Sequence, residues 1–273
     1  MNIRKVILSP WYLFRKCQAG LNIYKTCLLN YKFLPWKQAC RFPIHVYGKL
    51  HLSGDFGKIL IESENLQAGM ITFGANFSQF EATQGITLLD VSGVIRFQGY
   101  CRIGHKCTLS VQPSAEIFVG NGCRLSNGVK IKVYKYIEIQ PFVAITSECQ
   151  VFDTNFHYMR DTVTGLVQPL SKPVVIGRCS WVGNRTTIMK GSVLPPYTIV
   201  SSNSLVTRDY SNLGSYCIIG GMPAKLLKEH VTRVYEWDLY SKLDEHFAHS
   251  DEPYQTYTGT INEEEYIEKA YFH

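Results

Sequence analysis

One histidine stands in a segment whose side chains could carry out proton transfer. The segment reads Asp153-Thr154-Asn155-Phe156-His157-Tyr158-Met159-Arg160. An imidazole changes its charge near neutral pH, so His157 is suited to act as a general base toward an alcohol. A carboxylate that binds the other ring nitrogen would orient the imidazole, and Asp153 and Glu148 are both candidates. The alternative is an ordinary surface histidine in a loop.

The cysteines and the basic residues predict no second chemistry. The nine cysteines are an odd number and include no C-x-x-C pair, so neither a disulfide framework nor a zinc site is indicated. The lysines and arginines form no known nucleic-acid recognition motif. We therefore expect reduced thiols, no metal and no nucleic-acid partner.

The elements that must position His157 repeat every six residues. Branched aliphatic residues stand six apart without a gap at Ile176, Val182, Ile188, Leu194, Val200 and Val206. A small hydroxyl residue precedes each of the last five by two places, at Ser180, Thr186, Ser192, Thr198 and Ser204. Residues two apart in a strand share a face, so each short strand offers one small and one large inward side chain. Three such strands would close a triangular coil of about 18 residues.

The same step occurs earlier in two other phases, from Val91 to Leu109 and from Val119 to Cys149. Cys101, Cys107 and Cys123 take the small position of their repeats, which predicts buried thiols. Glycines follow ladder residues at Gly177 and Gly183, where we expect backbone conformations that a Cβ would forbid. A conventional β-sandwich is the alternative, but its strands would not keep a constant interval of six.

The repeat is interrupted before its last stretch. The interval from Cys149 to Ile176 is 27 residues, which is not a multiple of six. The sequence therefore predicts an inserted loop over residues 153–173, and this loop contains His157. Excursions from a rigid scaffold often carry function.

Four motifs together resemble the hexapeptide-repeat acyltransferases, in particular the group similar to maltose, galactoside and capsule-sugar O-acetyltransferases. The motifs are Asp-Thr-Asn-Phe-His at 153–157, Ile-Gly-x-x-x-Trp-Val-Gly at 176–183, Ser-Asn-Ser-Leu-Val-Thr-Arg-Asp at 202–209 and Gly-Gly-Met-Pro-Ala-Lys at 220–225. The resemblance covers roughly residues 91–230. It implies an all-β solenoid, the left-handed parallel β-helix, and a homotrimer with active sites between adjacent subunits.

The resemblance also implies roles for single residues in acyl transfer from acetyl-CoA. His157 matches the catalytic base, and Asn127 falls where related enzymes place an active-site asparagine. The alternative for Asn127 is a structural turn before Gly128. Many relatives carry Asp where this chain has Asn155, so the orienting carboxylate stays open between Asp153 and Glu148.

The remaining matched positions concern the acyl donor. Asn184 matches the residue whose backbone N–H points at the thioester oxygen, and Trp181 matches a residue lining the cleft near the pantetheine arm, with plain packing as its alternative. Ser202 matches a backbone contact to the pantetheine. Positions near the nucleotide phosphates are matched by Thr207, Arg208 and Lys225, although solvated surface charge is the alternative for Lys225.

We predict three regions in the chain. Residues 1–43 form a basic, aromatic and helical N-terminal segment, residues 44–222 form the β-helix, and residues 223–273 form a C-terminal helix with an acidic tail. Residues 1–50 hold nine Lys or Arg and no acid, whereas residues 241–273 hold eight acids. The N-terminal segment either rests on an anionic membrane surface or packs against the solenoid. No apolar run is long enough to span a membrane, so we expect a cytoplasmic protein.

These features predict an O-acetyltransferase that moves an acetyl group from acetyl-CoA to a sugar hydroxyl of a capsule, lipopolysaccharide or related glycan precursor. A non-catalytic β-helix scaffold is one alternative. A metal-dependent enzyme resembling the γ-class carbonic anhydrases is another, but its zinc needs three histidines, and the repeat region offers His105 and His157.

Overall fold

The computed structural model describes residues 16–17, 19–54, 57–75, 85–235, 237–250, 252–256, 262 and 265–267. The chain divides into two compact units, residues 1–231 and residues 232–273. This division falls near the predicted end of the β-helix at residue 222. The predicted boundaries at residues 43 and 222 stay predictions.

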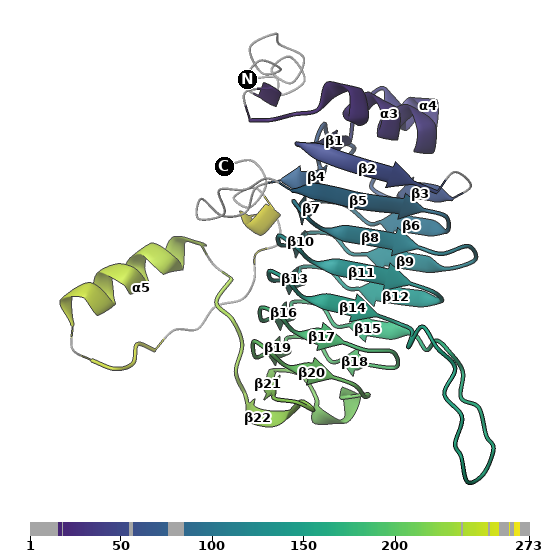
Figure 1. The fold of residues 1–273 in the computed structure, drawn as a ribbon. Coiled ribbons are helices and arrows are strands. Elements are labelled where there is room, and N and C mark those ends of the chain that lie inside the picture. Colours follow the sequence, from purple (N-terminus) through teal and green to yellow (C-terminus); the bar gives the residue numbers. More distant parts are fainter. Residues whose placement is uncertain are drawn as a thin grey trace. The chain divides into compact units, whose positions relative to one another are not determined.

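Three sheets of parallel strands make up the larger unit (Figure 1). The nine-stranded sheet contains, in spatial order, β1 (Ile44–Val46), β4 (Ile71–Ala75), β7 (Cys101–Gly104), β10 (Cys123–Leu125), β13 (Ala144–Ile145), β16 (Trp181–Val182), β19 (Ile199–Val200), β21 (Cys217–Gly220) and β22 (Lys225–Glu229). The seven-stranded sheet contains β2 (Lys49–Ser53), β5 (Ile86–Val91), β8 (Thr108–Val111), β11 (Lys130–Val133), β14 (Gln150–Phe152), β17 (Thr187–Ile188) and β20 (Leu205–Val206). The six-stranded sheet contains β18 (Val193–Leu194), β15 (Val174–Ile176), β12 (Tyr136–Ile139), β9 (Glu116–Val119), β6 (Val94–Phe97) and β3 (Lys58–Ile61).

Each coil places one strand in each sheet, so from β1 to β20 strands three apart in sequence are neighbours. The pairs β10 with β13 and β11 with β14 show this arrangement. Only β22 runs antiparallel to its neighbour among the described strands. The predicted left-handed parallel β-helix is confirmed.

The core of the prism is the predicted ladder. Its six aliphatic residues from Ile176 to Val206 are at most 1% exposed, and the small residues two places before them are equally buried. Each of these buried hydroxyls donates a hydrogen bond to a backbone carbonyl, as Thr198 does to Pro195 over 2.7 Å. The thiols predicted at Cys101, Cys107 and Cys123 are buried and form no disulfide bond. The hexad pattern therefore predicted the inward positions correctly.

Glycines after the ladder residues serve a different purpose from the one expected. Gly177 and Gly183 do not adopt the left-handed conformation. A Cβ on Gly177 would lie 2.5 Å from backbone atoms of Pro195 and Pro196, and one on Gly183 would lie 2.6 Å from the Ser202 nitrogen. These glycines are required by the close approach of the next coil.

Residues with side chains occupy the left-handed positions instead. At the corner between the nine-stranded and seven-stranded sheets, Glu148, Arg185 and Asn203 have φ between 56° and 62°. Their N–H groups donate to carbonyls of the coil below, for example from Asn203 to Asn184 over 2.9 Å. These bonds offset the strain of the left-handed conformation, which costs a non-glycine residue about 1 kcal/mol.

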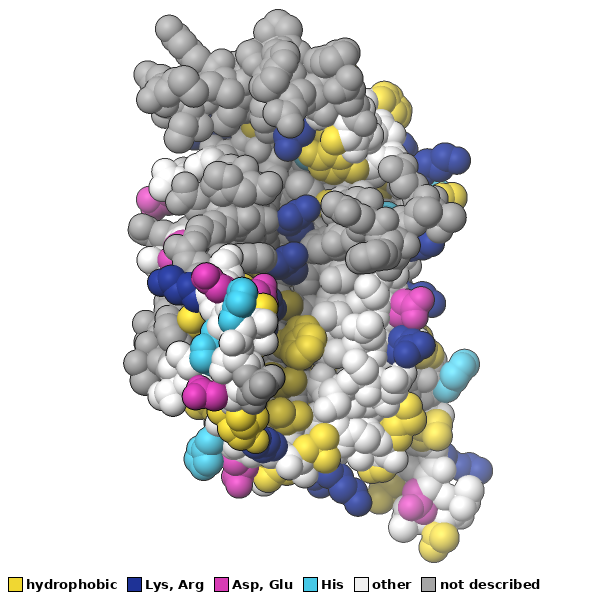
Figure 2. Space-filling view, turned by 90° about the vertical axis from the view of Figure 1, so that its left-hand side faces the viewer, with side chains coloured by type: hydrophobic (Ala, Val, Ile, Leu, Met, Phe, Trp, Pro, Cys, Tyr) yellow, Lys and Arg dark blue, Asp and Glu magenta, His cyan; other side chains and the backbone are white. Residues whose placement is uncertain are grey.

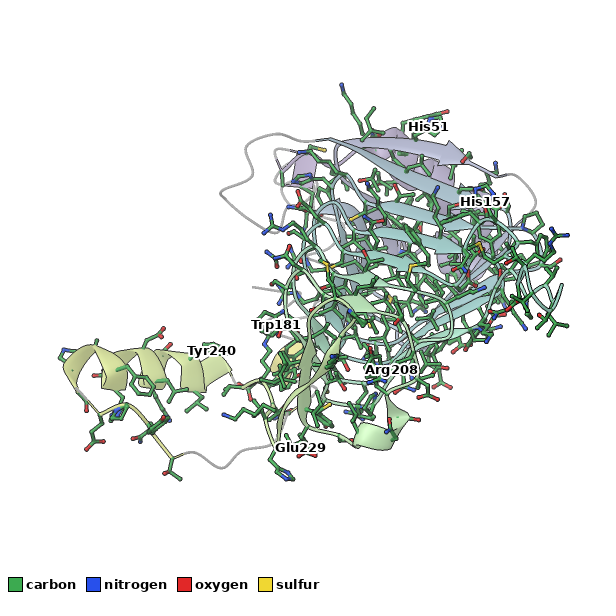
Figure 3. The ribbon with its side chains drawn as sticks, turned by 60° about the horizontal axis from the view of Figure 1, so that its bottom comes forward. His51, His157, Trp181, Arg208, Glu229 and Tyr240 are labelled. Atoms are coloured by element: carbon green, nitrogen blue, oxygen red, sulfur yellow. The ribbon has the colours of Figure 1, made fainter. Side chains whose placement is uncertain are left out.

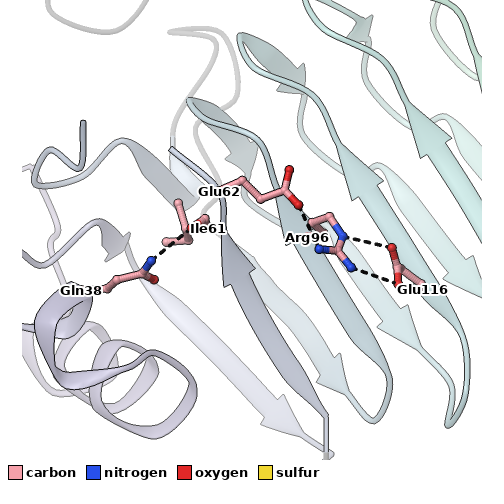
Figure 4. A network of polar contacts seen from close by, with 5 residues as sticks. All are labelled: Gln38, Ile61, Glu62, Arg96 and Glu116. Carbon is pink, nitrogen blue, oxygen red and sulfur yellow. Dashed lines mark hydrogen bonds and ion pairs between the residues drawn. The ribbon is translucent and has the colours of Figure 1, made fainter. Parts of the chain in front are cut away.

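An ionic network ties successive coils together on the outer face of the six-stranded sheet (Figure 4). The Arg96 guanidinium lies 2.9 Å from Glu62 and 3.1 Å from Glu116. In the same region, Gln38 donates to the Ile61 carbonyl over 3.1 Å. The charged groups are about one third exposed, so each pair contributes at most about 1 kcal/mol.

Two helices, α3 (Ile23–Phe33) and α4 (Trp36–Ala39), precede the first strand. The Asn30 amide donates to the Ile44 carbonyl over 2.7 Å and accepts from the Ile44 N–H over 3.2 Å. The Thr26 hydroxyl accepts from the Val46 N–H over 3.0 Å. Side chains of α3 therefore bond β1 as a further strand would. The predicted helical N-terminal segment is confirmed over these residues, whereas residues 1–15 lie outside the described part.

The predicted insertion leaves the prism between β14 and β15, and we call residues 153–173 the arm. Antiparallel bridges join Thr154 to Ser171 and Arg160 to Val167, so the arm is a hairpin that projects from the coils (Figure 1). At its base, the Asp153 carboxylate accepts hydrogen bonds from the N–H groups of residues 134, 135 and 136 over 2.8, 2.6 and 2.8 Å. The return strand of the arm is held by Lys190, whose ammonium donates hydrogen bonds to the Pro169 and Leu170 carbonyls.

The smaller unit contains α5 (Trp237–His249), which agrees with the predicted C-terminal helix. The rings of Tyr235 and Tyr266 pack with their centroids 6.2 Å apart. Much of the predicted acidic tail lies outside the described residues. In the described ranges, every helix is too short or too polar to cross a membrane.

His45 on β1 should make stability depend on pH. Its side chain is 6% exposed, and burial, aided by the charge of Lys16, lowers its pKa from 6.5 to about 4. Because the folded pKa lies below the unfolded one, protonation favours the unfolded chain. The free energy of unfolding should therefore fall by about 3 kcal/mol as the pH drops from 6.5 to about 4. Urea denaturation across this range should show a flatter pH dependence for His45→Gln, and an unchanged slope would contradict the prediction.

Asp153 should stabilise the fold through its three backbone hydrogen bonds. Burial raises the pKa of its carboxyl, while those bonds act in the opposite direction. In Asp153→Asn an amide NH₂ replaces one accepting oxygen, so the free energy of unfolding should fall by about 3 kcal/mol. The matched control is Asp161→Asn, because Asp161 accepts similar bonds at the exposed tip of the arm. Equal losses in the two variants, measured by denaturant unfolding, would argue against the role of Asp153.

Candidate active site

His157 projects from the first strand of the arm and is exposed. An aromatic group holds the residue before it. The Phe156 ring lies 5.3 Å from the Phe152 ring and 5.7 Å from the Tyr134 ring, and the Lys132 ammonium lies 5.6 Å from its centroid. Phe156 also adopts φ of 62°, with its N–H bonded to the Thr154 hydroxyl. The backbone entering His157 is thus anchored to the seven-stranded sheet.

The two candidate orienting carboxylates lie in different surroundings. Asp153 is fully buried and binds the turn at residues 134–136. Glu148 is exposed and lies at the corner before β14, whereas the arm begins after β14. Within the described part of the chain, the His157 ring makes no hydrogen bond or ion pair. Both carboxylates therefore remain candidates only.

Asn127 lies at the same corner as Glu148, one coil earlier. It is 3% exposed, and its side-chain oxygen accepts from the His105 N–H over 3.2 Å. Its carbonyl accepts from the Glu148 N–H over 3.0 Å. These contacts match the structural role that the sequence left open for Asn127. A similar contact occurs at the corner before β10, where the Asn121 side-chain oxygen accepts a hydrogen bond from the Tyr100 N–H over 2.8 Å.

Three residues predicted to contact the acyl donor lie on adjacent coils. Trp181 points outward from β16 with 38% of its surface exposed. Asn184 and Ser202 lie one coil apart at the next corner, and both are exposed. Their backbone N–H groups donate no hydrogen bond to any described residue. Two outward backbone donors therefore lie beyond Trp181, at the corner that follows β16.

The three residues predicted near the phosphates gather at the last coil. Thr207 and Arg208 are exposed directly after β20, and the Arg208 guanidinium lies 5.1 Å from the Tyr210 ring. The buried Tyr210 hydroxyl donates to the Ala224 carbonyl over 3.0 Å, and Lys225 follows as the exposed first residue of β22. This contact links the strand carrying Lys225 to the coil carrying Arg208.

The structure separates the proposed base from the proposed donor contacts. His157 and Trp181 lie on opposite sides of the prism (Figure 3). His157 leaves from the corner after the seven-stranded sheet, whereas Trp181 lies on the nine-stranded sheet. One chain alone therefore does not bring these two side chains together.

The contacts around His157 were not found by sequence reasoning. The spacing of Phe152 and Phe156 was visible, but Tyr134 and Lys132 belong to the previous coil. Their proximity depends on the pairing of β11 with β14, which places Lys132 beside Phe152. The six-residue repeat alone does not predict which residues pair between neighbouring coils. That pairing also depends on the number of residues in each corner.

Other reactive groups do not form a second centre in the described part of the chain. Three or more His, Cys, Asp or Glu side chains do not gather anywhere among those residues in a way that could hold a metal ion. His105, the other histidine of the repeat region, is buried in the fold, with 3% of its surface exposed. Burial raises the pKa of the Cys123 thiol to about 12 and raises that of Cys101 as well, so these thiols stay protonated.

Comparisons with known proteins identify acetyltransferases. No family model matches the chain. WbbJ of Escherichia coli, named for O-acetyl transfer in lipopolysaccharide biosynthesis, is 24% identical over 135 residues, which are 44% of this chain and 65% of that protein. A chloramphenicol acetyltransferase of Klebsiella aerogenes is 38% identical over 58 residues, which are 21% of this chain and 26% of that protein. The chain thus spans less than two thirds of the length of either relative.

The fold has a counterpart among solved structures. The crystal structure of the polySia-specific acetyltransferase NeuO superposes with a TM-score of 0.53 at 17% sequence identity. The match covers 77% of this chain and 85% of that one. The resemblance predicted from the motifs is confirmed: in sequence and in fold, the chain is similar to the hexapeptide-repeat acetyltransferases.

Proposed function

We propose that the protein is an O-acetyltransferase that moves an acetyl group from acetyl-CoA to a sugar hydroxyl. The observation that carries the proposal is the arm, which presents an exposed imidazole on an anchored backbone. The acetyltransferase relatives and the four sequence motifs support the same reaction.

His157 acts as the general base in this proposal. Its ring accepts the proton of the acceptor hydroxyl while the oxygen attacks the carbonyl carbon of the thioester. The proton then passes to the sulfur of the leaving thiolate, so the imidazole returns to its neutral form. Anchoring by Phe156 limits the motion of the backbone that carries the ring, and such positioning lowers the entropic part of the barrier.

Asn184 and Ser202 provide backbone donors for the acyl donor. Acetyl-CoA supplies an activated acetyl group and a chain of amides. The Asn184 N–H, which is unpaired among the described residues, stabilises the negative charge that develops on the carbonyl oxygen. The Ser202 N–H binds a pantetheine amide, and Trp181 covers the apolar part of the same arm.

Cations at the last coil fit the nucleotide end of the donor. Arg208 and Lys225 are both exposed, and Thr207 adds a hydroxyl beside them. Guanidinium and ammonium groups bind phosphates through charge-assisted hydrogen bonds. The donor would then extend from Trp181 toward the C-terminal coils.

A complete site requires a second copy of the chain, because His157 and Trp181 lie on opposite sides of the prism. A homotrimer with three equivalent interfaces would place the arm of one subunit over the nine-stranded sheet of the next. The acceptor in this proposal is a capsule, lipopolysaccharide or related glycan precursor. A cytoplasmic location, with the basic N-terminal segment on the inner face of the membrane, completes the proposal.

Replacing the base tests the reaction. His157→Ala should lower kcat by about 10²- to 10⁴-fold because no group then accepts the hydroxyl proton. The acetyl-CoA Kd, measured by calorimetry, should change less than about twofold. Release of free thiol in the presence of a panel of sugars and nucleotide sugars measures the reaction. Tyr158→Phe, which alters the neighbouring exposed residue, is the control, and full activity of His157→Ala would reject the mechanism.

Mixing two inactive variants tests the shared site. If His157 and Trp181 come from different subunits, trimers that contain both His157→Ala and Trp181→Ala chains regain one intact interface in three. A random equal mixture should therefore recover about a quarter of the wild-type sites. Activity after co-refolding of the two chains is the measurement. Activity that stays at the level of the separate variants would place both residues in one subunit's site.

A further inference from the structure

Cationic and aromatic side chains lie beside the backbone that carries the proposed general base. Lys130 and Lys132 are exposed and point outward from β11, whose alternate residues are buried. Strand register places Lys132 beside Phe152, and the Lys132 ammonium lies 5.6 Å from the centre of the Phe156 ring. His157 follows Phe156 directly, so the two Cα atoms lie about 3.8 Å apart. The seven-stranded sheet thus holds cations next to the start of the arm.

We infer that Lys132, with Lys130 beside it, binds the acidic group of an anionic sugar acceptor while His157 accepts the proton of the reacting hydroxyl. The inference rests on the proposed function and names the class of its acceptor. The ligand chemistry is a sugar or short sugar chain that carries a carboxylate or a phosphate group. An ammonium group binds either of these anions through charge-assisted hydrogen bonds.

The two lysines have no anionic partner among the residues that the structure describes. The ion pairs in that part of the chain involve other side chains. From residue 117 to residue 137 the sequence contains no Asp or Glu. The outward residues that pair with the lysines on β8 and β14 are uncharged, namely Thr108, Ser110, Gln150 and Phe152. An acidic group on the acceptor would therefore meet cations that are not already neutralised.

The acids nearest to this face in the chain are bound elsewhere or lie at another corner. The Asp153 carboxylate is buried and accepts three backbone hydrogen bonds from residues 134–136. The Asp161 carboxylate accepts backbone hydrogen bonds at the tip of the arm. Glu148 lies at the corner before β14 and forms no ion pair with either lysine. The positive potential of the lysines is thus available to a ligand.

Aromatic rings around Lys132 suit the apolar face of a sugar ring. Tyr134, Phe156 and Tyr158 have 38%, 38% and 70% of their surface exposed. The rings of Tyr134 and Phe156 pack edge to face with their centroids 5.7 Å apart. Such rings offer a flat apolar surface at little cost in side-chain entropy, and the cation on Phe156 is itself held by the ring. One short sugar chain could therefore contact the aromatic rings and the ammonium together.

The position of the lysines favours the acceptor over the acyl donor. The proposed donor contacts from Trp181 to Ser202 belong to the nine-stranded sheet and the corner that follows it. Figure 2 shows the side of this sheet, where hydrophobic side chains lie in the middle of the face. Both lysines lie on the seven-stranded sheet, after which the arm carrying His157 leaves the prism. In a site shared by two subunits, they belong to the subunit that supplies the base.

The test compares acidic acceptors with neutral counterparts in the full-length protein, with release of free thiol as the signal. The panel contains oligomers of galacturonic acid with their methyl esters, oligosialic acid with its reduced neutral form, and sugar phosphates with the free sugars. For the productive acidic acceptor, Lys132→Gln should raise KM about tenfold, with kcat and the acetyl-CoA KM within about twofold of the wild type. Lys132→Arg should lose less, because the charge remains. The carboxylate and phosphate arms distinguish the two sources of negative charge.

The neutral acceptors separate recognition of charge from support of the arm. Because Lys132 also contacts Phe156, a merely structural role would lower kcat for acidic and neutral acceptors alike in Lys132→Gln. Such parallel losses, an acceptor KM unchanged in Lys132→Gln, or use of neutral acceptors as good as that of acidic ones would overturn the inference. Lys49→Gln and Lys58→Gln, which remove exposed cations from strands of other coils, are the matched controls and should leave the acceptor KM unchanged.

Transfer to no acceptor by the wild type would reject the proposed function instead. Calorimetric binding of the same acidic sugars to the wild type and to Lys132→Gln then decides the inference. Binding that is about tenfold weaker in Lys132→Gln supports the site, whereas absence of binding, or equal binding by the two proteins, refutes it. The reaction and the recognition of the acidic group are thus tested separately.

Discussion

The stacking of one coil on the next is the constraint on which the remaining structure depends. Parallel strands pair in register, so each inward side chain meets an equivalent one in the coil below. An aliphatic residue every six positions fills this column, and a buried hydroxyl beside it bonds a carbonyl at a corner. The same register aligns the outward side chains, so Trp181, Ala144 and Arg124 form a column as an unavoidable result of core packing. Chemistry on the outer face is thus positioned by contacts inside the prism.

This constraint also decides where additional chain can leave the prism. A strand cannot lengthen without displacing the ladder, whereas a corner can open and close again in the same register. The arm does this between β14 and β15, which pair with β11 and β12 as the preceding coils do. Where the arm leaves the prism, the Asp153 carboxylate accepts a hydrogen bond from the turn of the coil below. Where the arm returns, Lys190 donates a hydrogen bond to its backbone. The arm therefore combines a rigid base with an exposed strand that carries His157.

The sequence predicted the inward pattern well because the hexad period directly reflects burial. Ile176 to Val206, the buried cysteines and the insertion at residues 153–173 all follow from it. Two features depended on information that one sequence does not display. The corners contain residues in the left-handed conformation, such as Glu148 and Arg185. A sequence usually indicates this conformation by a glycine, and these positions have none. Neighbours across coils, such as Lys132 with Phe156 or Arg102 with Arg124, depend on corner lengths that change along the chain. The role of Asn127 stayed open in sequence because a turn and a catalytic contact both favour an asparagine.

A stack of identical coils has no intrinsic reason to stop, and its terminal strands expose unpaired backbone groups that invite association with other chains. Here the first strand is occupied by Asn30 and Thr26 of α3, whose side chains imitate the missing neighbour. At the other end, β22 reverses direction against β21 and bears Lys225, Lys228 and Glu229. The solenoid is consequently a particle of finite length. Loss of the Asn30 amide would leave the Ile44 carbonyl and N–H at the edge of β1 without these partners and open to the strand of another chain.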